Sequence, residues 1–256
     1  MTEQVIIVPG LGGSAHAWNP LARSLDAVVV DRLEQDGLPT LEDEVAHVRA
    51  EAGRDPLIVA HSMGAFTAEA YARRHPVAGL VLVDPSVTQG ETEGYDAARR
   101  TFSLTRTVLN GIGKTGAPKL LGPAVWRASN RLAARRRLPA GDRKGAAKDY
   151  GDVRSTVSAA ADLIAYRAQA AELQRMRKYS LVSPEAPVVV LSAQGWGKED
   201  RHARKWAAWH QDLAKLFPEG QTEKVKGSGH LMHIDRPDMV EWAVRRVRAR
   251  SLGTSL

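Results

Sequence analysis

A serine stands between a predicted strand and a predicted helix in the first third of the chain. The apolar run Leu57–Val59 precedes the segment 60–64, which reads AHSMG, and an alanine-rich helical pattern follows over 65–74. Strand, tight turn and helix in this order predict a nucleophile elbow, in which a strained turn holds the hydroxyl of Ser62 above the end of a sheet. The residues two positions either side of the serine must be small, because the strand and helix backbones approach closely there. An alanine and a glycine meet that need.

A histidine near the end of the chain offers a base for this serine. The segment 227–237, which reads GSGHLMHIDRP, follows a predicted strand and precedes a helix that its final proline can begin. His230 follows a glycine, so the chain can bend there and present the imidazole. His233 is expected to pack or hydrogen-bond locally, and His61 is expected to point away from the reacting face. The other histidines are expected on the surface: His16, His47, His75, His202 and His210.

A glycine-rich loop follows the first predicted strand. The strand covers 5–8, and the loop covers 9–14 with the sequence PGLGGS. Attack of a serine on an acyl group puts negative charge on the carbonyl oxygen, and two backbone N–H groups must stabilise it. The sequence predicts those of Met63, directly after the nucleophile, and of Leu11, which has a glycine on each side. A dinucleotide-binding loop is the alternative, since Asp31 ends the second strand, but the glycine spacing does not match Gly-x-Gly-x-x-Gly.

Together these motifs resemble those of proteins with the α/β-hydrolase fold. Ser62, His230 and the loop 9–14 stand at that family's positions and in its order, and the resemblance covers residues 4–250, more weakly in the middle. Two positions depart from the family's pattern without removing a catalytic atom. The elbow opens with alanine rather than glycine, and proline replaces the histidine that often precedes the loop. The resemblance implies an α/β fold with a mostly parallel central sheet of about six strands and flanking helices.

The sequence offers three candidates for the carboxylate that would orient His230. In the family this acid usually follows the strand before the last one, here 187–192, but no carboxylate follows that strand directly. Glu199 and Asp200 lie slightly further along the chain. Some relatives carry the acid after the strand that follows the nucleophile helix, where this chain has Asp84. We expect Asp84, because it follows its strand directly and reaches His230 without a long loop. Asp200 and Glu199 are the alternatives. The non-catalytic interpretation of Asp84 is that it only caps a turn.

Strands and helices alternate along most of the chain, which favours a parallel sheet. Strands are expected near 5–8, 27–30, 57–60, 79–83, 187–191 and 222–226, and helices near 15–25, 41–52, 63–74, 203–217 and 237–250. Trp206 and Trp209 belong to an apolar stripe that is expected to pack on the core. The alternation breaks in the middle of the chain. We therefore expect a hydrolase-fold core domain from 1–87 and 181–256, with a helical cap over 88–180.

The predicted cap carries the positive charge of the chain. Residues 91–180 contain 18 Lys and Arg against 8 Asp and Glu, a net of +10, whereas the whole chain has a net charge of +7. Apolar residues recur there at helical spacing, with Arg127, Arg131 and Arg135–Arg137 among or beyond them. Three interpretations remain open: a solvated helical face over the site, attraction of an anionic substrate such as an acyl carrier or a coenzyme A thioester, and contact with an anionic membrane. No nucleic-acid-binding motif accompanies the charge.

Composition excludes several classes of chemistry. The 256 residues include no cysteine, so disulfides and cysteine metal sites are excluded. The histidines are scattered without a metal-binding motif, and we expect neither a metal nor another cofactor. The first strand begins at Val5, which leaves no room for a signal peptide, and no apolar run approaches the roughly 20 residues that span a bilayer. We expect a cytoplasmic protein without stable membrane insertion and without a nucleic-acid partner; the sequence gives no indication of its oligomeric state.

These residues predict a serine hydrolase that cleaves a carboxylic ester or thioester. The expected substrate is a small acyl compound, which includes anionic and carrier-bound ones. Ser62 would attack the acyl carbon, His230 would take its proton, and an acyl-enzyme would form and be hydrolysed. The same site could serve acyl transfer, carbon–carbon bond hydrolysis or a lyase reaction. A ligand-binding protein on a hydrolase fold is the non-enzymatic alternative. Haloalkane dehalogenation is disfavoured, because it requires a carboxylate where this chain has Ser62.

Overall fold

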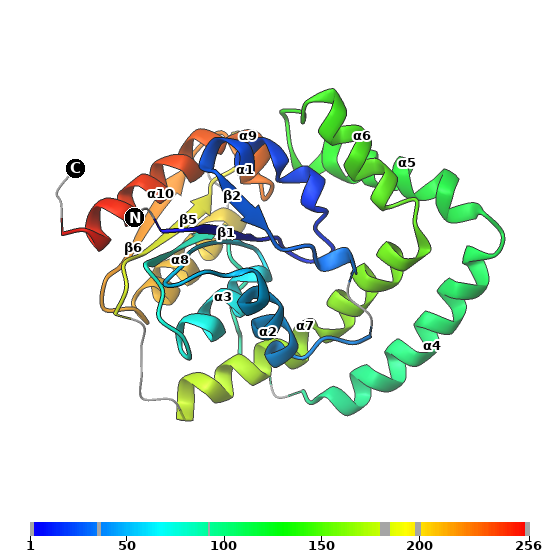
Figure 1. Cartoon of the computed structure of the whole chain (residues 1–256), viewed down its shortest axis with the longest axis horizontal. Helices are drawn as coiled ribbons and strands as arrows, with labels where there is room; N and C mark the ends of the chain where they lie inside the picture. The colour runs from blue at the N-terminus through cyan, green and yellow to red at the C-terminus, as the bar shows by residue number, and fades with distance from the viewer. Residues whose placement is uncertain (1–2, 35–36, 92, 180–184, 198–200, 254–256) are drawn as a thin grey trace.

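Six parallel strands form the central sheet of the computed structural model, which describes residues 3–34, 37–91, 93–179, 185–197 and 201–253 (Figure 1). The strands are β1 (Val5–Val8), β2 (Ala27–Val29), β3 (Leu57–His61), β4 (Gly79–Val83), β5 (Val188–Ala193) and β6 (Gly220–Val225). Their order is β2-β1-β3-β4-β5-β6, and every pairing is parallel. The predicted fold class is therefore confirmed. The chain reverses its direction of travel across the sheet between β1 and β3, and ligands of such sheets bind at the carboxyl ends of the strands beside that reversal.

Helices cover both faces of the sheet. One face carries α2 (Leu41–Glu51), α3 (Gly64–Ala72) and α8 (Arg201–Ala214), and the other carries α1 (Asn19–Leu25), α9 (Met232–Asp235) and α10 (Pro237–Ser251) (Figure 1). Successive strand residues face opposite sides, so Ile58 packs toward α2 and α3 while Val59 packs toward α1 and α10. Because both faces are buried, the central strands are continuous apolar runs without polar alternation.

Two of the predicted helices differ from the observed ones at their first turn. The helix expected from residue 15 begins as a short 3-10 turn, Ala15–Ala17, and α1 starts only at Asn19. Pro20 lies in the first turn of α1, where its missing N–H has no partner to lose. The helix expected from residue 63 begins at Gly64, because the turn that carries Ser62 extends through Met63.

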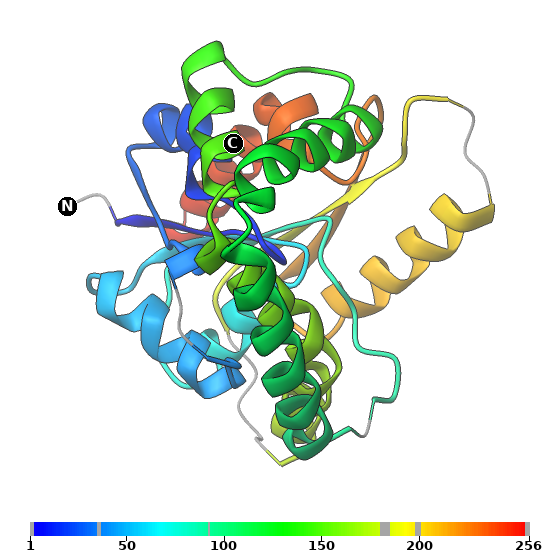
Figure 2. The ribbon, with the colours of Figure 1, turned by 90° about the vertical axis from the view of Figure 1, so that its right-hand side faces the viewer.

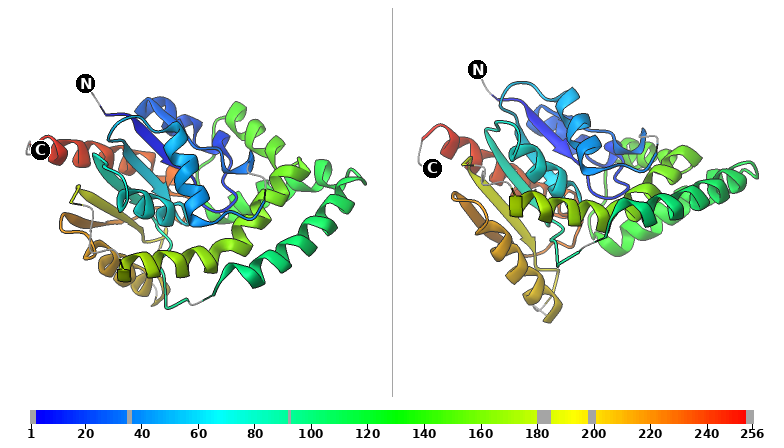
Figure 3. Two further views of the ribbon diagram at one scale, coloured as in Figure 1. Left: turned by 60° about the horizontal axis from the view of Figure 1, so that its bottom comes forward. Right: turned by 90° about the horizontal axis from the view of Figure 1, so that it is seen from below.

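Among the described residues between β4 and β5, four helices occupy the region where the strand–helix alternation of the sequence breaks (Figures 2 and 3). They are α4 (Tyr95–Gly113), α5 (Ala117–Ala133), α6 (Ala140–Asp149) and α7 (Val153–Tyr179). We call them the insertion. The ribbon views show α4 running alongside α7, and α5 and α6 extending over the carboxyl edge of the sheet. Within the described residues, every helix is too short or too polar to cross a lipid bilayer.

A buried ion cluster joins the insertion to the rest of the molecule. Arg32, in the 3-10 turn Arg32–Glu34 after β2, lies 2.9 Å from Glu44 of α2 and 2.9 Å from Asp162 of α7, measured from its two terminal nitrogens to the nearest carboxylate oxygens. All three side chains are at most 2% exposed. Two carboxylates around one guanidinium offset the cost of burying these charges, and removing one partner from such a cluster costs about 3–5 kcal/mol. The cluster therefore fixes α7 against α2.

We expect Gly79→Ala to destabilise the protein by about 1–3 kcal/mol, because β4 and α10 are in direct backbone-to-side-chain contact there. A methyl group at this position would overlap Cγ1 of Val247 and lie 2.9 Å from the carbonyl oxygen of Pro187. Chemical denaturation measures the change. Gly141→Ala is the control, since a methyl group there meets nothing within 4 Å. Equal stabilities of the two variants would contradict the close packing of β4 on α10.

Candidate functional site

The carboxyl ends of three neighbouring strands bring the predicted site residues to one edge of the sheet. The loop 9–14 follows β1, Ser62 follows β3, and Asp84 follows β4. These strands are adjacent in the sheet and parallel, so their turns lie side by side. His230 enters the same edge from the segment between β6 and α9.

Ser62 occupies a strained turn between β3 and α3. Its φ angle is 51°, in the left-handed region that non-glycine residues seldom adopt. The turn is held from both sides: the Ser62 N–H donates to the carbonyl oxygen of Val83 at 3.1 Å, and its own carbonyl oxygen accepts from the N–H of Ser86 at 2.9 Å. A methyl group on Gly64 would lie 2.6 Å from the carbonyl oxygen of Val8, so α3 begins directly against the end of β1. This is the geometry that the sequence pattern predicts.

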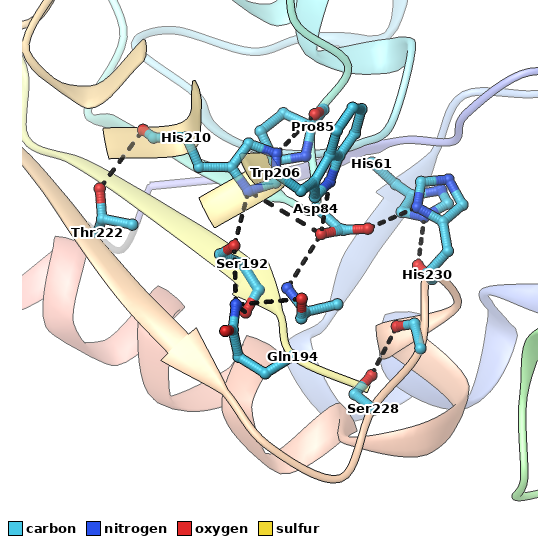
Figure 4. Close-up of polar contacts among 12 residues, drawn as sticks. His61, Asp84, Pro85, Ser192, Gln194, Trp206, His210, Thr222, Ser228 and His230 are labelled. Carbon is cyan, nitrogen blue, oxygen red and sulfur yellow. Dashed lines mark hydrogen bonds and ion pairs between the residues drawn. The ribbon is translucent and has the colours of Figure 1, made fainter. Parts of the chain in front are cut away.

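His230 and Asp84 are joined by a hydrogen bond. Nδ1 of His230 lies 2.6 Å from Oδ2 of Asp84 (Figure 4). The side chain of Asp84 is 4% exposed, and its other carboxylate oxygen accepts from the Ala193 N–H at 3.0 Å and from Nε1 of Trp206 at 3.2 Å. A carboxylate surrounded by donors accepts from Nδ1–H, which leaves Nε2 of His230 with its lone pair free. The alternatives Asp200 and Glu199 lie outside the described residues.

The prediction that His61 points away from the site is wrong. Its ring lies 4.6 Å from the ring of His230, centroid to centroid, and its Nε2 lies 2.9 Å from the carbonyl oxygen of His230. A carbonyl only accepts, so Nε2 of His61 carries the proton and donates it. Burial, followed by the neighbouring His230 and His233, holds the pKa of His61 well below its usual range. His61 therefore acts as a neutral donor that fixes the backbone of His230. No local signal marked this contact, because its acceptor lies 169 residues along the chain.

His233 packs against the core beneath the site. Its ring stacks on Trp18, with centroids 3.9 Å apart and planes 14° apart. Burial, with a smaller contribution from His230, lowers the pKa of His233 to about 3. His233 is therefore a neutral side chain at physiological pH, and its Nδ1 has no hydrogen-bond partner within the described part of the chain.

His210 is buried, contrary to the surface position predicted for it. Its Nε2 donates to the carbonyl oxygen of Pro85 at 2.9 Å, and its Nδ1 lies 2.9 Å from the hydroxyl of Ser192 (Figure 4). The same Nδ1 is 4.0 Å from Oδ1 of Asp84. Burial lowers the pKa of His210, against an opposing effect of the Asp84 carboxylate. Helix α8 thus supplies both Trp206 and His210 to the surroundings of Asp84. The apolar stripe of this helix predicted only packing on the core.

The two N–H groups that the sequence predicts as oxyanion donors belong to Leu11, in the loop after β1, and to Met63, the residue after Ser62. Within the described residues, the N–H of neither Leu11 nor Met63 donates a hydrogen bond. The loop after β1 touches the serine turn, since a methyl group on Gly10 would lie 2.8 Å from Cβ of Ser62. The loop closes tightly on itself through a bond of 2.9 Å from the Gly13 N–H to the Gly10 carbonyl oxygen.

The insertion holds this loop in shape. The N–H of Gly12 donates to Oδ2 of Asp162 in α7 at 2.9 Å, and its carbonyl oxygen accepts from the hydroxyl of Tyr150. Gly12 has a φ angle of 57°, and a methyl group there would lie 2.9 Å from Cβ of Ala159. Asp162 is also a partner of Arg32 in the buried ion cluster. One carboxylate therefore connects the loop beside Ser62 to the anchor of α7.

Ser62 and His230 share the site without a direct hydrogen bond. Within the described part of the chain, no bond joins the Ser62 hydroxyl to the imidazole of His230, whose side chain is 44% exposed. The structure thus pairs His230 with Asp84 and sets Ser62 against the loop 9–14, with His61 between the two groups as the chain neighbour of Ser62 and the hydrogen-bond donor to His230.

A cavity of about 500 Å³ opens beside this edge of the sheet. Gly10, Leu11 and His61 line it from the core, and the insertion contributes a largely apolar wall from α4, α5 and the start of α7: Leu109, Ile112, Leu121, Val125, Trp126 and Val153. None of its described lining residues is an Asp, Glu, Lys or Arg, and the low pKa values of His61 and His233 keep both rings neutral. The cavity therefore suits an uncharged, apolar group.

Within the described ranges, no trio of His, Cys, Asp or Glu side chains is arranged to hold a metal ion. The polar groups at this edge of the sheet are instead a hydroxyl, an imidazole paired with a carboxylate, and free backbone N–H groups. This set can activate a nucleophile and stabilise an oxyanion.

Comparisons with other proteins agree with this geometry. Residues 5–241 match the family described as the alpha/beta hydrolase family. Similar solved structures include MenH from S. aureus (14% identity, TM-score 0.61, covering 98% of this chain and 96% of that chain). A thermophilic esterase from Thermogutta terrifontis is 18% identical, with a TM-score of 0.62 over 98% of this chain and 91% of that one. An alpha/beta hydrolase fold protein from Burkholderia ambifaria is 17% identical, with a TM-score of 0.64 over 95% and 90% of the two chains.

At such identities the structural likeness shows the fold alone. No protein of curated function matches this chain by sequence. The match to the family covers most of the chain, from β1 into α10. The protein belongs to the alpha/beta hydrolase family.

Proposed function

We propose that this protein is a serine hydrolase that cleaves a carboxylic ester or thioester with an apolar acyl group. The observation that carries the proposal is the hydrogen bond of 2.6 Å between His230 and Asp84 beside the strained turn of Ser62. Positive φ angles at both Ser62 and Asp84 support it, because backbone strain of this kind clusters at active sites.

In the proposed reaction Ser62 attacks the acyl carbon and Nε2 of His230 accepts the hydroxyl proton. Asp84 stabilises the imidazolium that forms, and the N–H groups of Leu11 and Met63 stabilise the oxyanion. His230 then protonates the leaving alcohol or thiol, and a water activated by the same imidazole hydrolyses the acyl-enzyme. A direct bond between Ser62 and His230 is not required in the unliganded protein, since catalytic hydrogen bonds often tighten only when substrate binds.

His230 is the best base among the three neighbouring histidines. His61 and His233 are buried and have lowered pKa values, so neither accepts a proton readily. His61 also has its Nε2 proton committed to the backbone of His230. Only His230 combines solvent access with a carboxylate partner.

We assign the apolar cavity to the acyl group and the insertion, within the predicted cap 88–180, to its roof. Gly10 and Leu11 line the cavity and belong to the loop that would bind the oxyanion. An acyl chain in the cavity would thus have its carbonyl beside the proposed N–H donors. The uncharged lining supports an apolar acyl group over an anionic one at this position.

Ser62→Ala is expected to abolish hydrolysis of p-nitrophenyl esters, with kcat falling by about 10⁶-fold as in other serine hydrolases that lose their nucleophile. The circular dichroism spectrum and melting temperature should stay close to those of the unaltered protein. Retained turnover in this variant would refute the nucleophile.

Asp84→Asn serves as the companion variant and should lower kcat by about 10⁴-fold, because the imidazole loses the acceptor that fixes its tautomer. Labelling with a fluorophosphonate separates an enzyme from a binding protein. A folded protein that forms no adduct on Ser62 would contradict the proposed hydrolase.

Asp162→Ala is expected to lower kcat by tenfold or more with little change in KM, because Gly12 loses the acceptor that shapes the oxyanion loop. Removal of one oxyanion donor lowers kcat by about 10²- to 10³-fold, and this is the largest loss that we expect for Asp162→Ala. Glu44→Ala is the matched control: it removes the other carboxylate from the same buried Arg32 but does not touch the loop. Both variants should lose stability. Equal losses of kcat per folded molecule would show that Asp162 acts only through stability.

The protein is expected to lose stability as the pH falls from about 6.5 toward about 3. The pKa of His233 is about 3 in the folded protein and near 6.5 in an unfolded chain. Between these values the unfolded chain binds a proton that the folded protein does not, so unfolding becomes easier. One such group costs about 2 kcal/mol between pH 7 and pH 5. Denaturation at both pH values should show a smaller loss in His233→Leu, and an unchanged pH dependence would contradict the buried neutral ring.

A further inference from the structure

We propose that a second cavity, lined by arginines, binds a phosphate group on the leaving group of the acyl substrate. This inference rests on the proposed hydrolase activity and names the substrate class that the same site would take. The cavity has a volume of about 640 Å³ and lies between α5, the segment 134–138, α6 and α9. Six arginines line it: Arg127, Arg131, Arg135, Arg136, Arg137 and Arg143.

These arginines have no carboxylate partner in the described part of the chain. No described residue that lines the cavity is acidic. Arg135 lies over the ring of Trp196 at 5.2 Å, and Arg136 reaches only the backbone carbonyl oxygen of Asp235 at 3.5 Å. The Asp235 carboxylate accepts from the backbone N–H groups of Arg135 and Arg136 and not from their guanidinium groups. The guanidinium groups therefore still repel one another, and an anion bound among them would be stabilised.

The acidic residues of the insertion are committed elsewhere. Asp142 pairs with Arg23, and Asp162 belongs to the buried cluster around Arg32. Asp149 accepts from the hydroxyl of Ser14, and Glu172 accepts from the hydroxyl of Tyr95. The acids thus hold the insertion together and to the core. The six cavity arginines belong to the excess of positive charge that the sequence carries over 91–180.

The walls of the cavity favour binding of a phosphate group at a defined position over loose association of ions from solvent. Trp126 and Leu138, both buried, contribute apolar surface between the arginines, together with Ile234. Low-dielectric walls focus the field of the charges into the cavity. Guanidinium groups present a planar pair of donors that matches phosphate oxygens, which makes arginine a preferred phosphate ligand.

The arginine cavity adjoins the apolar cavity that Gly10, Leu11 and His61 line. Trp126 and Asn130 of α5 line both. Asp235 connects the two regions: its Oδ1 accepts from the N–H groups of Arg135 and Arg136, and its Oδ2 accepts from the N–H of Gly229, the residue before His230. A substrate with an apolar acyl chain in one cavity and a phosphate in the other fits this arrangement.

The ligand chemistry is therefore an acyl ester or thioester whose leaving group carries a phosphate. Two sources share this chemistry: thioesters of coenzyme A and acyl esters of glycerol 3-phosphate. In both, the reaction is the hydrolysis already described, in which the acyl–oxygen or acyl–sulfur bond breaks and His230 returns the proton to the leaving group. No further co-reactant is needed.

Binding tests the arginine cavity without catalysis. Calorimetry on the full chain at fixed ionic strength would measure the Kd of coenzyme A and of glycerol 3-phosphate. Arg131→Gln combined with Arg143→Gln removes two cavity arginines from α5 and α6. Arg100→Gln combined with Arg106→Gln removes the same charge from exposed positions on α4. We expect the cavity variant to weaken binding of at least one probe tenfold or more, and the control variant to change it less than twofold.

Equal weakening in the two variants would assign binding to the overall charge and overturn the proposal, as would a cavity variant that binds both probes as well as the unaltered protein does. Melting temperatures of both variants should match that of the unaltered protein, since neither pair makes a described side-chain contact with an acid.

Turnover identifies the source of the phosphate. Butyryl-coenzyme A is compared with S-butyryl-N-acetylcysteamine, and a 1-acylglycerol 3-phosphate with the corresponding 1-acylglycerol. The cavity variant should lose kcat/KM tenfold or more for the phosphate-bearing member of one pair and leave its neutral counterpart unchanged. Equal losses within both pairs would overturn the proposal. Arginine-dependent binding in a protein that hydrolyses none of these compounds would refute the hydrolase while leaving the phosphate site intact.

Discussion

The close approach of two backbones at the carboxyl edge of the sheet is the constraint on which the candidate site depends. The turn around Ser62 and the loop after β1 touch through positions that have no room for a side chain: Gly64 lies against the carbonyl oxygen of Val8, and Gly10 lies against Cβ of Ser62. This contact sets the loop 9–14, to which Leu11 belongs, against the turn that carries Ser62 and Met63. The parallel sheet makes it possible, because adjacent strands end at the same edge.

Polar side chains of α8 contact Asp84 at the carboxylate oxygen that does not bond to His230. Trp206 and His210 of α8 approach the same carboxylate oxygen, one as a donor and the other at 4.0 Å. His61 plays the corresponding part for His230 by binding its backbone. Buried polar groups are costly unless they are paired, so such contacts hold their members in one geometry. The histidine and the carboxylate are thus each fixed by residues that do not themselves take part in the proposed chemistry.

Sequence patterns predicted the parts of this arrangement that are local. The strand–turn–helix pattern around Ser62 and the glycine-rich loop are encoded within a few residues, and the apolar runs predicted the six strands correctly. Contacts between distant segments had no such signal. His210 looks like a surface residue of an amphipathic helix, and His61 meets its acceptor 169 residues away. Hydrophobic periodicity shows that Trp206 is turned toward the core, but it does not show that an indole N–H reaches Asp84.

Asp162 makes one contact with the ion cluster and one with the loop beside the serine turn, and this couples the insertion to the core. It neutralises Arg32 in a dry environment and accepts the N–H of Gly12 beside the serine turn. Helix α7 carries the carboxylate that makes both contacts, so a change at this position alters the ion cluster and the loop together. A chimaera that replaces this insertion with one from another protein must therefore retain α7 of this chain.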